Sequence, residues 1–155
     1  MNDSVETTGT AYHEAAHAVS LDHYGVPVQR VTVSQKNAGV TNFSRAEFEA
    51  LDEKKASIVI LAGMYGESRV RTDRTVVEFI SIALGATSDR DLLHERFAAY
   101  WSSTSSIAHQ VAHGAAENFV GKHWAEIERV ANALLKQSGF PKTLNEAEFR
   151  AALKI

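Results

Sequence analysis

The sequence predicts a mainly α or α+β domain with a small β-sheet. Most of the chain carries apolar residues at helical spacing, and one segment, 26–34, alternates as a strand does. No series of strands alternates with helices, so a doubly wound sheet is not expected. With 155 residues, of which 45% are hydrophobic, the chain is long enough for one domain, 1–155, with its own core.

The first predicted helix runs over 11–24. Thr10 is its expected N-cap, and Gly25 followed by Pro27 is a typical helix end. The apolar residues of this helix do not gather on one side, so its amphipathicity is weak.

A strand and a short return strand are expected next. Segment 26–34 places Val31 and Val33 on one face, and the turn signal at 37–39 leads into a second strand over 40–43. These two segments make up the predicted small sheet.

The rest of the chain is predicted to be helical. Capping boxes, in which a side chain three residues into the helix bonds back to the cap, are expected at Ser44–Glu47 and Thr143–Glu146. The expected helices cover 44–66, 75–84, 88–100, 106–137 with a break near Gly121, and a last helix through Leu153.

Composition excludes several functional classes. The net charge is −3 and the basic residues are scattered, so no nucleic-acid-binding face is expected. The absence of cysteine excludes disulfides and thiolate metal sites. The N-terminus is too polar for a signal peptide, and the apolar stretches 58–65 and 76–86 are shorter than the roughly 20 residues that span a bilayer. We therefore expect a cytoplasmic protein without membrane insertion.

One motif carries specific chemistry. His13 and His17 lie four residues apart on the first predicted helix, so both imidazoles face the same side and can bind one ion. Glu14 follows the first of them and points beside the ion, where it can take a proton from a zinc-bound water and pass it to a leaving amine. This is the H-E-x-x-H pattern of zinc peptidases. The simpler alternative is a surface helix with two solvated histidines.

The pattern needs a third ligand, because catalytic zinc usually takes three protein ligands and leaves a position for water. Without cysteine, the candidates are Asp or Glu at the start of a later element. Asp89 and Asp91 stand at a predicted helix start, directly after segment 85–88.

Other histidines are interpreted as packing or solvated residues. His109 and His113 also have the i, i+4 spacing, but Gln110 stands where a glutamate would follow. A second metal site there is possible on spacing alone, and packing is the favoured interpretation.

Four segments resemble the zinc peptidase domain of FtsH-type AAA proteases. Residues 10–18 resemble that family's T-A-x-H-E-A-G-H-A, and residues 27–33 resemble its P-V-x-K-V-T-I strand. Residues 60–67 are similar to its L-x-G-x-x-A-E helix, and residues 85–89 to its G-A-S-N-D segment. The helices near the C-terminus also resemble the family's closing helices, so the similarity covers most of the chain.

The resemblance implies a zincin-like helical domain whose small sheet lies at the active-site cleft. It implies zinc as the cofactor, with His13, His17 and Asp89 as ligands and Glu14 as general base. It also implies that the strand containing Val31, Thr32 and Val33 binds a polypeptide substrate by strand addition.

The chain departs from the family in three respects. Ala16 replaces the motif glycine, the stretch 67–85 is longer, and no ATPase module or membrane anchor accompanies the domain. The expected function is therefore a stand-alone zinc metallopeptidase, independent of ATP, that acts on unfolded or partner-presented polypeptides.

Two other interpretations remain. One is a catalytically weak or inactive binding or regulatory module that keeps the fold. The other is a structural or non-peptidase zinc site, which a fourth ligand such as Glu67, His109 or His113 would favour. Substrate preference and oligomeric state do not follow from the sequence, and a homo-oligomer or a partner ATPase in trans is compatible with it.

Overall fold

The structure is a computed structural model that describes residues 4–36, 38–71 and 106–154. Within these residues the fold is mainly helical with one small antiparallel sheet, as predicted. The predicted helices 75–84 and 88–100 lie outside the described residues.

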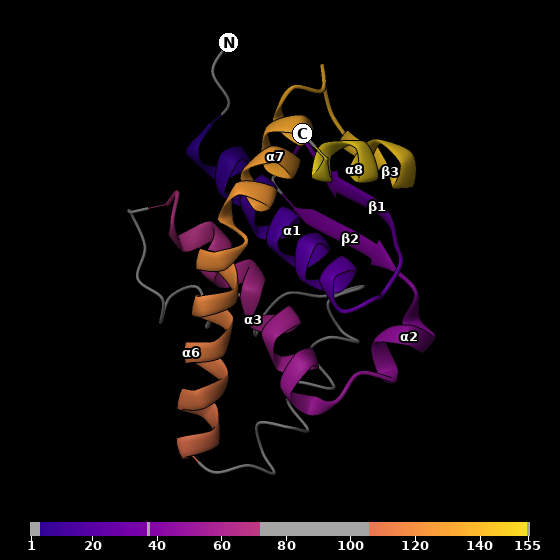
Figure 1. The fold of residues 1–155 in the computed structure, drawn as a ribbon. Helices are drawn as coiled ribbons and strands as arrows, with labels where there is room; N and C mark the ends of the chain where they lie inside the picture. Colours follow the sequence, from indigo (N-terminus) through magenta and orange to yellow (C-terminus); the bar gives the residue numbers. More distant parts are fainter. Residues whose placement is uncertain (1–3, 37, 72–105, 155) are drawn as a thin grey trace.

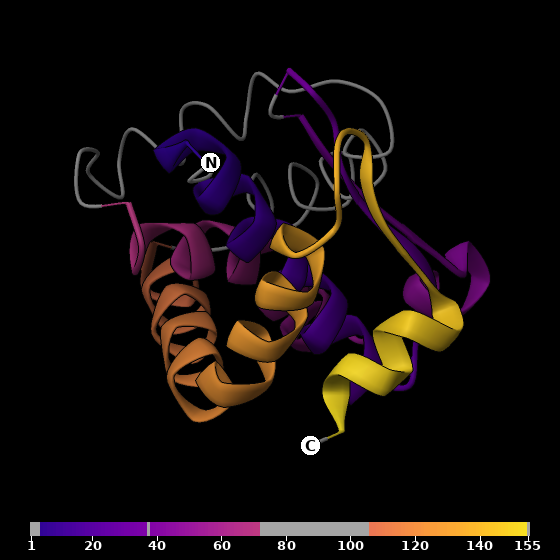
Figure 2. The same cartoon turned by 90° about the horizontal axis from the view of Figure 1, so that it is seen from above.

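Helix α1 (Val5–His23) runs through the middle of the fold. It packs on α3 and α7 and on strands β1 and β2 of the sheet, as Figures 1 and 2 show from two sides. The prediction that Thr10 caps this helix is wrong. Ser4 is the N-cap and accepts a hydrogen bond from the Thr7 amide, whereas the Thr10 hydroxyl donates to the Glu6 carbonyl one turn back.

Helix α1 ends where the sequence indicated. Gly25 adopts a positive φ of 78°, a conformation that favours glycine, and the chain then turns into the sheet.

Within the described residues, the sheet has three strands in the order β2-β1-β3. Strands β1 (Val28–Val33) and β2 (Gly39–Phe43) form the predicted antiparallel pair, with Val31 opposite Thr41. Strand β3 (Lys142–Asn145) pairs with the other edge of β1, with Val31 opposite Leu144. Strand β3 was not predicted from the sequence.

The segment predicted as one helix over 44–66 forms two. Helix α2 (Arg45–Glu49) is short, and the Ser44 side chain makes no capping hydrogen bond. Helix α3 (Glu53–Ser68) begins anew because the Asp52 carboxylate accepts a hydrogen bond from the Lys55 amide.

The C-terminal part contains three helices. Helix α6 (Ser106–Lys122) and helix α7 (Trp124–Leu135) meet at His123, close to the predicted break. Helix α7 buries Ile127, Val130, Ala131 and Leu134, which belong to its predicted apolar stripe.

Helix α8 (Glu146–Leu153) begins later than predicted. Its capping box is formed by Asn145 and Glu148, because Thr143 lies inside β3.

The core lies between α1, the inner face of the sheet, α3 and α7. Its largest fully buried side chains include Phe48, Phe149, Leu21 and Ile127. No helix in the described ranges is both long enough and apolar enough to span a membrane.

Candidate metal centre

The segment that carries the motif is enclosed by other elements. Every residue of α1 from Gly9 to Leu21 is buried, including the polar His13, Glu14 and His17. Because α3, α7 and the sheet surround this helix, it needs no single apolar stripe, which explains its weak amphipathicity. The alternative of two solvated histidines on a surface helix is therefore excluded.

The two histidines direct the same ring nitrogen toward one point. Nε2 of His13 and Nε2 of His17 lie 3.0 Å apart. Both residues are buried, His13 with 9% and His17 with 6% of its surface exposed. Two nitrogens that bind one tetrahedral zinc at about 2.0–2.1 Å are themselves about 3.3 Å apart. The observed separation is close to that value.

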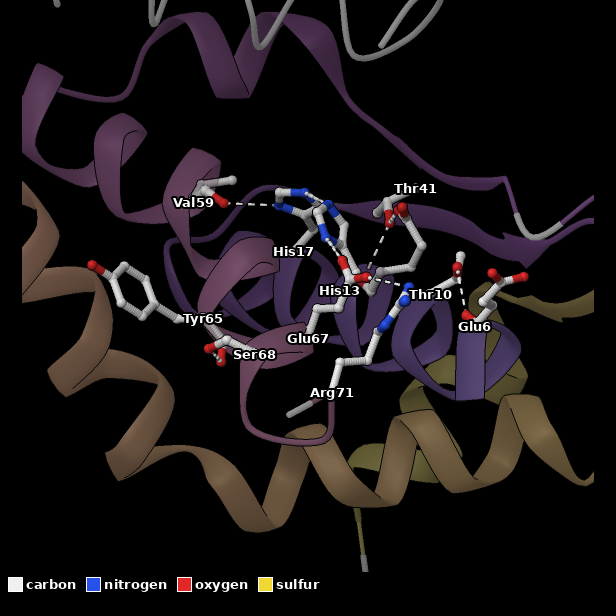
Figure 3. A network of polar contacts seen from close by, with 11 residues as sticks. Glu6, Thr10, His13, His17, Thr41, Val59, Tyr65, Glu67, Ser68 and Arg71 are labelled. Atoms are coloured by element: carbon white, nitrogen blue, oxygen red, sulfur yellow. Dashed lines mark hydrogen bonds and ion pairs between the residues drawn. The ribbon is translucent and has the colours of Figure 1, made fainter. Parts of the chain in front are cut away.

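The other ring nitrogens are held by partners on α3. Nδ1 of His17 donates to the carbonyl oxygen of Val59 at 2.8 Å, since a carbonyl only accepts. Nδ1 of His13 lies 2.9 Å from Oε2 of Glu67 and donates to this carboxylate. Figure 3 shows both contacts side by side. In the neutral form, each histidine then presents a lone pair at Nε2.

This arrangement favours a cation between the rings. Two Nε2 lone pairs that face each other at 3.0 Å repel unless a proton or a metal ion lies between them. Partners that fix the tautomer of metal-binding histidines through the second ring nitrogen are typical of metal sites.

Gly63 of α3 leaves room at this point. A Cβ atom built on Gly63 would lie 2.7 Å from Nε2 of His13 and closer still to Nε2 of His17. The missing side chain therefore lets α3 pack closely beside both nitrogens without a methyl group in front of them. Two neutral imidazoles whose Nε2 atoms point at each other are a donor set that fits a zinc ion.

Glu14 lies beside the pair and is held by strand β2. The residue is 2% exposed, and the Thr41 hydroxyl donates to its Oε2 at 2.7 Å. A Cβ on Gly39 would lie 2.6 Å from the carboxylate carbon of Glu14, so the backbone of β2 packs directly on this group. These contacts restrict the rotation of the carboxylate.

Glu67 does not act as a ligand from α3 in this arrangement. Its carboxylate binds the Nδ1 side of His13, away from the two Nε2 atoms. Within the described ranges no third His, Asp or Glu joins the pair at metal-binding distance. Asp89 and the alternative Asp91 lie outside the described residues.

Ala16 is accommodated by a glycine on the facing helix. A Cβ on Gly66 would lie 2.7 Å from Cβ of Ala16 and 2.9 Å from the carbonyl oxygen of Tyr12. Gly66 therefore gives Ala16 the space for its methyl group, and α1 and α3 approach each other closely at this point.

In the second histidine pair, His113 is within hydrogen-bond distance of Tyr65 on α3. Nδ1 of His113 lies 2.7 Å from the hydroxyl of Tyr65, and burial followed by the charge of His109 lowers the pKa of His113. His23 and His123 pack on Phe119 in an aromatic cluster near the end of α1.

Strand addition at Val31, Thr32 and Val33 does not fit the observed sheet. Strand β1 is central, and these residues pair with β2 on one edge and with β3 on the other. A peptide strand therefore has no edge of β1 to join at this segment.

Sequence reasoning did not assign a site role to several residues, namely Thr41, Gly39, Val59, Gly63, Gly66 and Arg71. Among these, only Gly63 and Gly66 carry a usable signal. They stand three residues apart in an apolar helix, which indicates close contact with another element.

Comparison with known proteins adds no assignment. No family model matches the chain, and no curated protein does.

Proposed function

We propose that this chain is a zinc-dependent metallopeptidase of the type found in FtsH-like proteases, acting on polypeptides without its own ATPase. The observation that carries the proposal is the pair of Nε2 atoms of His13 and His17, 3.0 Å apart, with both Nδ1 atoms held by acceptors. Buried Glu14 follows the first of these histidines, and hydrolysis requires a base at that place.

The ligand set would consist of His13, His17 and a carboxylate. Asp89 is the proposed third ligand, on the resemblance of segment 85–89 to the family. A zinc ion held there supplies Lewis acidity toward a carbonyl oxygen and makes water easier to deprotonate. Three protein ligands leave a position for water, as a catalytic site requires.

Glu14 would act as the general base. Thr41 holds one oxygen of its carboxylate, and the packing on Gly39 limits where the other oxygen can turn. A fixed carboxylate next to the histidine pair can accept a proton from water and return it to the leaving amine. Its burial excludes competing solvent contacts.

The proposed substrate is an extended polypeptide, and the edge strand β2 is its proposed binding element. In the described sheet β2 is an outer strand, and it also supplies Thr41 and Gly39, which contact Glu14. A peptide added along Gly39–Phe43 would therefore run beside the proposed base.

The deciding experiment combines metal content with hydrolysis. We expect about one zinc per chain in the purified protein, and loss of this zinc in the double variant His13→Ala/His17→Ala. The matched control is His109→Ala/His113→Ala, which removes a histidine pair of the same spacing from α6 and should keep the zinc.

Hydrolysis of an unfolded protein substrate is then measured for wild type and Glu14→Gln. We expect Glu14→Gln to retain zinc and to lose turnover. A zinc-loaded wild type without turnover would favour the binding-module interpretation, and a wild type that takes up no zinc would refute the metal site itself.

A further inference from the structure

A buried arginine lies behind Glu67. Arg71 is 5% exposed, and its Nη1 lies 3.4 Å from Oε1 of Glu67. The other oxygen of the same carboxylate, Oε2, accepts the hydrogen bond from Nδ1 of His13 at 2.9 Å. Glu67 thus connects Arg71 with His13, and Figure 3 shows the three side chains in a row.

Gly9 of α1 makes room for this arginine. A Cβ on Gly9 would lie 2.8 Å from Cγ of Arg71, closer still to Cδ, and 3.3 Å from Cγ of Glu67. The apolar stem of Arg71 therefore lies on the bare backbone of α1, one turn before His13. A side chain at position 9 would displace it.

The charges suit a positioning role. A carboxylate that is 13% exposed is costly to bury unless it is paired, and arginine remains charged at all relevant pH values. With Arg71 on one oxygen, the carboxylate keeps a fixed plane and directs its other oxygen at Nδ1 of His13. A hydrogen bond to Nδ1 decides which tautomer the imidazole adopts.

We propose that Arg71, seated on Gly9, is a positioning residue that holds the Glu67 carboxylate on Nδ1 of His13 and thereby keeps Nε2 of His13 available to the metal. This role rests on the proposed function for its purpose. Its physical content, the tautomer of His13, exists without metal and without turnover.

The test compares two independent ways of removing the arginine contact. Arg71→Met removes the charge and keeps the length of the stem, whereas Gly9→Ala leaves the charge and pushes the stem aside. Arg71→Lys keeps a positive charge and should therefore change the His13 tautomer and the zinc affinity less than Arg71→Met does. Arg45→Met is the matched control, because it removes an exposed Arg–Glu pair with the same spacing on α2.

Two readouts are required. The tautomer of His13 is measured by ¹⁵N NMR at mildly alkaline pH on metal-free protein in which every variant also carries His17→Ala, so that no second lone pair faces Nε2 of His13. Zinc affinity is measured by competition with a chelator. We expect wild type and Arg45→Met to keep the proton on Nδ1, and Arg71→Met and Gly9→Ala to shift it toward Nε2. The zinc Kd of the two variants should rise about tenfold, the lower end of the range for residues that orient a ligand.

The proposal is overturned if folded Arg71→Met and Gly9→Ala both keep the wild-type tautomer. If Arg71→Met does not fold, Gly9→Ala and Arg71→Lys decide, since Ala favours a helix more than Gly does. Failure of the proposed function looks different. A protein that binds zinc without hydrolysing peptides still gives both readouts, and one that binds no zinc still gives the tautomer.

Discussion

The close contact between Ala16 of α1 and Gly66 of α3 predicts a strong coupling between positions 16 and 66. In Gly66→Ala the new methyl group would lie 2.7 Å from Cβ of Ala16, a distance that real Cβ atoms essentially never show. We therefore expect Gly66→Ala to destabilise the protein. Ala16→Gly should relieve the part of the defect that comes from the two methyl groups, whereas the contact with the Tyr12 carbonyl oxygen at 2.9 Å remains.

The magnitudes follow from two opposing effects. Overpacking at position 66 costs about 1–3 kcal/mol, and the higher helix propensity of alanine returns about 1 kcal/mol, so Gly66→Ala should lose about 0–2 kcal/mol. Ala16→Gly loses about 1 kcal/mol of propensity and about 0.8 kcal/mol for the buried methyl group. In the double variant the propensities cancel and one methyl group remains in the interface.

We expect the double variant to lose less stability than the sum of the two single variants, with a coupling energy of about 0.5–3 kcal/mol between the two positions. The assay is urea unfolding of the metal-free single and double variants. Gly114→Ala is the control, because no described atom lies within 4 Å of the added Cβ, and it should be neutral or stabilising. If the two single effects add within about 0.5 kcal/mol, the close contact does not exist.

Two further predictions concern the histidines. Gly63→Ala places a methyl group in close contact with both Nε2 atoms and should abolish zinc binding while the fold is kept. Zinc content and circular dichroism measure the two effects, and a folded variant with full zinc would show that the metal does not bind between these nitrogens. Burial, and to a smaller extent the charge of His109, lower the pKa of His113 in the folded protein. As the pH falls, the unfolded chain therefore binds a proton at His113 before the folded protein does. The free energy of unfolding is unaffected by this group above its unfolded pKa of about 6.5 and decreases as the pH falls from there to the lower folded pKa. Urea unfolding between neutral and mildly acidic pH should therefore show a smaller decline in His113→Gln, and an NMR titration of His113 at or above the unfolded value would refute this.

The parts of the fold that the sequence predicted depend on local signals. The end of α1 follows from Gly25 and Pro27, the β1–β2 pair from alternation around Val31, and the buried face of α7 from its 3.6-residue period. Strand β3 could not be found in this way. It has only four residues, and Lys142–Asn145 forms a strand because β1 offers an edge more than a hundred residues earlier in the chain.

Competing caps account for the displaced helix boundaries. Ser44 and Thr143 both matched a capping box, yet Asp52 and Asn145 begin the longer helices α3 and α8. A box pattern states only that a cap is possible. Tertiary pairing, here the position of Thr143 in β3, decides whether the backbone is available for it.

In the candidate site, too, local patterns could be predicted from the sequence and tertiary contacts could not. The histidine pair and Glu14 could be predicted because one turn of one helix carries all three. Their partners come from positions 27 to 54 residues away along the chain, and the carbonyl of Val59, which fixes His17, has no sequence signature since every residue has a carbonyl group. The glycines are intermediate, because a glycine in an apolar helix indicates a close approach without naming what approaches. The fold alone creates the contacts that set the tautomers of His13 and His17, and these tautomers decide whether the motif can hold a metal. For this reason the sharpest tests change Gly63, Gly9 and Arg71 rather than the motif itself.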